Sequence, residues 1–260
     1  MSALLGIGFF ITAILYAAVG FGGGSTYNAL LVLNGTDYRI LPSLALACNI
    51  LVVTGGVIRF WRSGHISLKR LAPFLIASVP AALIGGRIPV SETVFIGLLG
   101  SALLLSGLRL AFQPATALTT SQPYTRANPA LSLCVGGAIG FLSGLVGIGG
   151  GIFLAPILYI TRWGSPRQIA AACSVFILAN SISGLTGQVA KLSDMAVLSL
   201  ARPYWSLLLC VLIGGQIGSW LASERLSPSI IKRLTAILIL YVAARLLWRW
   251  AQLVGFSPIG

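Results

Sequence analysis

Two short runs of glycine are the residues in this sequence most able to do chemistry. The first run covers residues 22–24 and the second covers residues 149–151, and each lies between two apolar stretches. Glycine lowers helix propensity by about 1 kcal/mol per residue relative to alanine, so three in a row predict a break in a helix. Broken backbone persists at membrane depth only where protein or a polar cavity covers it, and the free N–H groups of the next helix attract anions. The runs therefore predict an anion site between helices that begin at Ser25 and Ile152.

Polar side chains near these runs extend the predicted site. Ser25, Thr26 and Asn28 follow the first run, whereas the apolar Ile152 and Phe153 follow the second, so the site is expected to be chemically lopsided. Two asparagines inside apolar stretches also belong to it, because a buried amide needs a partner or a wet cavity. The candidate substrate-binding residues are Gly22, Gly23, Gly24, Ser25, Thr26, Asn28, Asn49, Gly149, Gly150, Gly151, Asn180 and Arg87.

Each of these residues also has a purely structural interpretation. Glycines allow helix backbones to approach closely, as in G-x-x-x-G pairs. The amides of Asn49 and Asn180 could bridge two helices instead of lining a cavity. The guanidinium of Arg87 could bind an anion, but its place near a helix end equally allows it to reach the membrane surface or to pair with Glu92.

The composition identifies lipid as the solvent around these residues. Of the 260 residues, 57% are hydrophobic and 8% are charged, whereas a soluble domain carries charge on about a quarter of its residues. The mean hydropathy is +0.97. The formal net charge of +13 fits basic loops at a membrane surface rather than nucleic-acid binding, because the basic residues lie mostly between apolar runs. The four cysteines lie inside apolar runs without C-x-x-C spacing, which indicates helix packing rather than disulfides or metal binding.

The apolar runs predict an all-α integral membrane protein with about eight transmembrane helices, since each crossing needs about 20 residues. The expected helices cover residues 4–19, 42–61, 71–86, 93–112, 129–146, 168–190, 203–222 and 230–250.

Matching motifs divide these helices into two homologous four-helix repeats, each with a glycine-broken first helix. The Leu-Ile-Gly-Gly motif that begins at Leu83 recurs at Leu212, and a serine and an asparagine share one spacing in both halves, at 43 and 49 and at 174 and 180. Breaks at corresponding positions of two repeats indicate a transport site. The expected division is residues 1–112 for the first repeat, 113–128 for a polar loop and 129–260 for the second repeat.

Several classes of protein are not expected from this sequence. No G-x-x-x-x-G-K-[ST] motif occurs, so the chain is not expected to use ATP. With one histidine and no buried pair of acids, we expect no metal, no other cofactor and no enzymatic activity. The acids fall near helix ends or in loops, so no intramembrane proton relay is predicted; they are Asp37, Glu92, Asp194 and Glu224.

The glycine runs and the paired Leu-Ile-Gly-Gly motifs resemble the sulfite exporter family TauE/SafE. The resemblance is carried by residues 20–24, 144–151 and 153–156 and spans nearly the whole chain. It implies a multi-pass protein of the bacterial inner membrane that transports sulfite, sulfoacetate, related sulfonates or other small organic anions.

Together these observations predict a secondary transporter that exports a small anion down the membrane potential. The alternatives are an importer or uniporter of another small metabolite and a non-transporting membrane scaffold subunit. Ten basic residues on one side against seven on the other favour both termini in the cytoplasm. The expected partners are a small anionic substrate and membrane lipids, without nucleic acid, and a homo-oligomer stays open.

Overall fold

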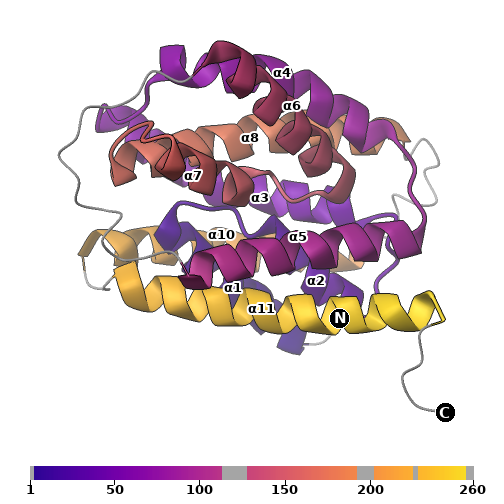
Figure 1. The fold of residues 1–260 in the computed structure, drawn as a ribbon. Helices are drawn as coiled ribbons and strands as arrows, with labels where there is room; N and C mark the ends of the chain where they lie inside the picture. The colour runs from indigo at the N-terminus through magenta and orange to yellow at the C-terminus, as the bar shows by residue number, and fades with distance from the viewer. Residues whose placement is uncertain (1–2, 113–127, 192–201, 225–227, 256–260) are drawn as a thin grey trace.

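A computed structural model describes residues 3–112, 128–191, 202–224 and 228–255, and every regular element in them is helical (Figure 1). Nearly all of the expected inter-repeat loop, 113–127, and Asp194 lie outside the described residues. The elements are α1 (Ala3–Val19), α2 (Gly24–Leu33), α3 (Leu41–Arg62), α4 (Leu68–Arg87), α5 (Glu92–Phe112), α6 (Pro129–Val146), α7 (Gly151–Ile160), α8 (Pro166–Lys191), the 3₁₀ turn η2 (Arg202–Tyr204), α10 (Trp205–Glu224) and α11 (Pro228–Leu253).

The all-α prediction is confirmed within the described residues. Each of the eight ranges expected from the sequence coincides with one of the longer helices to within three residues at either end. The short apolar stretches after the glycine runs form α2 and α7. Five of the described helices are long and apolar enough to cross a bilayer, namely α3, α4, α5, α6 and α8. The chain is therefore a multi-pass helical membrane protein.

Large apolar side chains cover the outside of the molecule. Leu4 and Phe112 are about four-fifths exposed, and Ile76, Trp205 and Ile237 are about two-thirds exposed. Exposed apolar side chains in such number are unfavourable in water and favourable against acyl chains. The exposed faces are therefore lipid-facing surfaces, and the buried side chains form the helix contacts.

Helices α3 and α8 pack against each other at the centre of the molecule (Figure 1). On one side, α4 contacts both α8 and α6, and on the other side, α10 contacts both α3 and α1. Thus α4, from the first half of the chain, packs mainly against the second half, and α10, from the second half, packs against the first. Helices α5 and α11 pair with each other along the edge opposite α4 and α6. This exchange of helices ties the two halves together.

The contact between α4 and α6 depends on a glycine stripe. Gly136, Gly140 and Gly144 recur every four residues on α6 and lie against the backbones of Phe74, Ser78 and Ala82, which share the same spacing on α4. A Cβ on any of the three glycines would overlap a main-chain carbonyl group of α4. The structural interpretation of glycine as a packing residue therefore holds for this stripe, which the sequence analysis did not single out.

Two arginines bind the C-terminal ends of the short helices. Arg249 of α11 donates to the carbonyl oxygen of Val32 near the end of α2, at 2.6 Å, and pairs with Glu92 at 3.0 Å. Arg70 of α4 donates to the carbonyl oxygen of Trp163 just beyond α7, and its guanidinium lies 4.5 Å from the centre of the indole ring. A cation is favourable at a helix C-terminus, so both arginines stabilise the C-terminal ends of α2 and α7. The contact of Arg70 with the indole ring adds a cation–π interaction.

The glycine stripe on α6 gives a testable prediction about stability. Gly140→Ala should lower the free energy of unfolding by about 1–3 kcal/mol, because its Cβ would collide with the Ser78 backbone. Gly137→Ala is the matched control on the same helix, since its Cβ would lie 3.7 Å from the Ala77 side chain, an ordinary contact distance. Thermal unfolding of the purified protein in detergent measures both. Equal transition temperatures for the two variants would show that the α4–α6 contact is not as tight as described.

Candidate functional site

Both glycine runs break the chain between two helices, as the sequence predicts. The first break separates α1 from α2, and the second separates α6 from α7. The residues that precede the short helices, Gly23 and Gly150, have φ of +85° and +79°. L-amino acids with side chains rarely adopt this left-handed conformation, so glycine is required there. Neither helix start has a side-chain cap, and the helices begin at Gly24 and Gly151, one residue earlier than expected.

The two breaks lie against each other in the interior. Asn28, in the first helical turns of α2, is fully buried, and its side-chain nitrogen donates to the carbonyl oxygen of Val146 at 2.7 Å. The same nitrogen lies 3.5 Å from the carbonyl oxygen of Gly147. A Cβ placed on Gly24 would lie only 2.8 Å from that Gly147 oxygen. The structure thus brings together residues that are more than a hundred positions apart in the sequence.

Asn49 of α3 occupies the space between the breaks. Its side-chain nitrogen donates to the carbonyl oxygen of Ile148 at 3.2 Å, and its side chain is fully buried. The amide fits against Gly22 and Gly24 from the first break and Gly149 from the second, each of which would collide with it if it carried a Cβ. The glycines therefore form a cradle for one asparagine amide.

A third amide completes the set that holds the second break. The side-chain nitrogen of Gln188, on α8, donates to the carbonyl oxygen of Gly144 at 2.7 Å and lies 3.4 Å from that of Leu145. With Asn28 and Asn49, it gives the five consecutive carbonyl groups of residues 144–148 a side-chain donor each. The sequence analysis left Gln188 out of the candidate residues, because it gave this amide less weight than Asn49, although both are polar amides in apolar runs.

The first break is surrounded by hydroxyl groups instead. The hydroxyl of Tyr16 on α1 lies 2.7 Å from that of Thr26, and both side chains are buried. Ser25 is 4% exposed and also interacts with the Tyr16 hydroxyl. The sequence analysis missed Tyr16, because an isolated tyrosine in an apolar helix gives no positional signal. Of the residues that follow the second break in sequence, the half-buried Ile152 and its neighbour Phe153 provide no polar side chain.

Two of the candidate residues have surroundings of their own. The side-chain nitrogen of Asn180 donates to the carbonyl oxygen of Phe176 in its own helix, at 2.8 Å, and its side chain is fully buried. Arg87 is exposed at the C-terminal end of α4. Glu92, which the sequence offered as a partner for Arg87, pairs with Arg249. The structure does not bring Arg87 into the glycine cradle.

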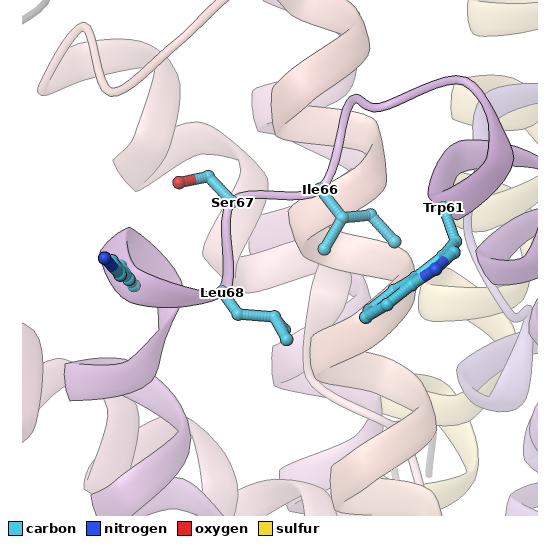
Figure 2. Close-up of a pocket in the computed structure, with 5 residues that line it drawn as sticks. Trp61, Ile66, Ser67 and Leu68 are labelled. Carbon is cyan, nitrogen blue, oxygen red and sulfur yellow. The ribbon is translucent and has the colours of Figure 1, made fainter.

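A pocket lies elsewhere, at the connection between α3 and α4. It measures about 340 Å³ and is lined by Trp61, residues 66–68 and Lys69. Figure 2 shows the side chains of Trp61, Ile66 and Leu68 directed toward a common space, whereas Ser67 points away from it. An exposed tryptophan beside a lysine at a helix end is typical of the membrane–water interface. We therefore regard the glycine cradle, and not this pocket, as the candidate solute site.

The described residues contain no group of three or more histidine, cysteine, aspartate or glutamate side chains that could hold a metal ion. The polar atoms of the cradle are instead amides, hydroxyls and main-chain groups. Arrangements of this kind bind solutes by hydrogen bonds and helix dipoles.

Comparison with known proteins shows what the whole chain is similar to. The family model described as Sulfite exporter TauE/SafE matches residues 4–246. The chain is 36% identical to the "Probable membrane transporter protein y4hK" of Sinorhizobium fredii, over 94% of this chain and 97% of that protein. It is 24% identical to the "Probable membrane transporter protein YunE" of Bacillus subtilis, over 85% of this chain and 89% of that protein. No solved structure matches.

The fit of Asn49 in the cradle gives a prediction with an internal control. Gly149→Ala should cost more stability than Gly35→Ala, although both glycines have positive φ values, +85° and +74°. The reason is that a Cβ on Gly149 would lie 2.7 Å from the Asn49 side-chain nitrogen, whereas a Cβ on Gly35 would meet no atom within 4 Å. Both variants carry backbone strain of about 1–3 kcal/mol, and only the first adds a collision. If thermal unfolding in detergent gave the same loss for both, the cradle would not be tightly packed around Asn49.

Proposed function

Because this chain belongs to the sulfite exporter TauE/SafE family, we propose that it is a secondary transporter that exports sulfite, a sulfonate or a related small organic anion. Export proceeds down the membrane potential of a cell that is negative inside. That potential supplies about 2.3 kcal/mol per charge per 100 mV, or roughly a fifty-fold concentration ratio. Coupling to ATP or to a second ion is then unnecessary for a monovalent anion.

The observation that carries the proposal is the meeting of two uncapped helix starts inside the molecule. In each short helix, the amides of the third and fourth residues bond to the preceding glycine carbonyl, at Gly23 and at Gly150. The amides of the first two residues have no intrahelical partner, which is a consequence of helix geometry. Each N-terminus also carries about half a positive elementary charge. Two such ends beside one cradle favour a small anion, and oxygen clusters such as those of sulfite suit several amide donors at once.

The proposal includes an arrangement in the membrane. The chain forms two four-helix repeats with eight crossings in the bacterial inner membrane, and α2 and α7 are half-helices that follow the breaks inside the protein. Both termini lie in the cytoplasm. The equal lengths of α2 and α7 and the exchange of α4 and α10 between the halves support two related repeats.

The proposal is tested by flux from proteoliposomes. Vesicles loaded with sulfite or isethionate should release it faster when a potassium gradient with valinomycin makes the interior negative. Anion-loaded vesicles without protein, and protein-containing vesicles without valinomycin, are the controls. Folded protein that releases none of these anions would favour the scaffold alternative. Faster release with a positive interior would mean that each anion leaves together with enough cations to carry net positive charge.

The difference between the two breaks gives a second prediction for the same assay. Ser25→Ala should weaken the apparent affinity for the transported anion about ten-fold or more, because a hydrogen bond to a charged ligand is worth about 1.5–3 kcal/mol. Ile152→Ala should change it far less, since this side chain offers no donor. Concentration-dependent efflux measures both variants. A larger loss of affinity for Ile152→Ala would place the main anion contacts at the second break.

A further inference from the structure

The three side-chain amides that pair the carbonyl groups of the second break all do so with the same kind of atom. Asn28, Asn49 and Gln188 use their side-chain nitrogens as donors to main-chain carbonyl groups. A carbonyl oxygen cannot donate, so these bonds fix which end of each amide faces the backbone. The oxygens of the three amides are buried and accept no hydrogen bond from the residues that the structure describes. Pairing the carbonyl groups of the second break therefore leaves three buried amide oxygens without a hydrogen-bond donor among the described residues.

One of these acceptors is part of the cradle itself. The side-chain oxygen of Asn49 faces Gly22 of the first break, close to the start of α2. The hydroxyl of Ser181 on α8, also buried and without a described partner, faces Gly149 of the second break. The side chain of Ile177 approaches both Gly22 and Gly149, so the two breaks share this neighbour. Donors from the helix starts and acceptors from these side chains thus flank the same small region.

A plain anion satisfies only half of this arrangement. Its oxygens can accept from the helix-start amides, but they repel the lone pairs of the Asn49 oxygen and leave that acceptor buried without a partner. A ligand with a hydroxyl or another donor group next to its anionic oxygens satisfies both sides. A site built to hydrogen-bond a substrate hydroxyl strongly rejects an analogue that lacks it.

We propose that the transported substrate is a singly charged oxyanion that also carries a hydrogen-bond donor, such as hydrogensulfite or a hydroxyalkanesulfonate. The side-chain oxygen of Asn49 accepts the hydrogen bond from that donor, and the Ser181 hydroxyl assists it from the second break. This inference rests on the proposed function, because it names the chemical class of the anion that the same site exports.

The wild-type protein tests the proposal with two anions of nearly equal size. Isethionate, HO–CH₂–CH₂–SO₃⁻, carries a hydroxyl group where 1-propanesulfonate carries a methyl group. As competitors of labelled sulfite efflux, isethionate should have an apparent affinity about ten-fold or more higher, because the analogue leaves a buried acceptor unpaired. A site without acceptors would show the opposite order, since the more apolar ligand enters a buried site more readily.

Two variants test whether the side chains of Asn49 and Ser181 accept the hydrogen bond from the substrate. Asn49→Ala should reduce the preference for isethionate to less than about three-fold, and Ser181→Ala should reduce it in part while leaving the protein folded, because its hydroxyl has no described partner. Thr186→Val is the matched control on α8, because Thr186 is exposed and bonds only within its own helix. If Asn49→Ala does not fold, the wild-type comparison and Ser181→Ala decide the question.

Each outcome has one meaning. Equal competition by the two sulfonates overturns the donor requirement but leaves anion export standing, as long as sulfite efflux remains. Competition that appears only when sodium replaces choline in the medium also overturns it, because the acceptors would then hold a cation. If neither sulfonate competes and no sulfite is released, both the inference and the proposed function are wrong.

Discussion

The need to pair main-chain carbonyl groups at a helix break is the constraint on which the rest of this structure depends. The carbonyl groups of residues 144–148 are buried, and each one left without a hydrogen-bond donor would cost several kcal/mol. Three side-chain amides meet this need, from α2, α3 and α8. These helices must therefore converge on the end of α6, which places the first break beside the second.

Glycine has two separate functions along the same segment of chain. On α6 it removes side chains so that the backbone of α4 can approach. Beyond the stripe, at Gly147 and Gly150, it supplies the left-handed conformations that end α6 and precede α7. The close contact fixes α6 against α4, and α4 in turn contacts α8, the helix that carries Gln188. The close packing of α6 on α4 therefore helps to position Gln188 against the carbonyl groups at the end of α6.

The chemistry of the cradle follows from how its polar groups are already used. The helix starts keep amide donors that no side chain caps, whereas the amides that stabilise the second break have only their oxygens left. Family membership sets the class of the protein as a membrane transporter, and this division of donors and acceptors is what the chain's own residues add to it. The arginines contribute at other places. Arg249 and Arg70 hold the outer ends of the short helices, and Arg87 is exposed at the end of α4.

The sequence by itself determined the helical class, the positions of the longer helices and the two breaks, because apolar run length and glycine runs are local signals. It also marked Asn28, because this residue follows the first glycine run, and Asn49 and Asn180, because a polar amide in an apolar run stands out without any partner being known. Only the tertiary structure decided what these amides bind, that Gln188 joins them, and that α4 and α10 pack across the halves. Those facts depend on contacts between residues distant in sequence, 44 positions apart for Gln188 and Gly144 and 118 for Asn28 and Val146. One sequence carries no record of which distant carbonyl a given amide will meet. The sequence could not decide the partner of Arg87 for the same reason. Whether Glu92 pairs with Arg87 or with Arg249 depends on where α11 lies.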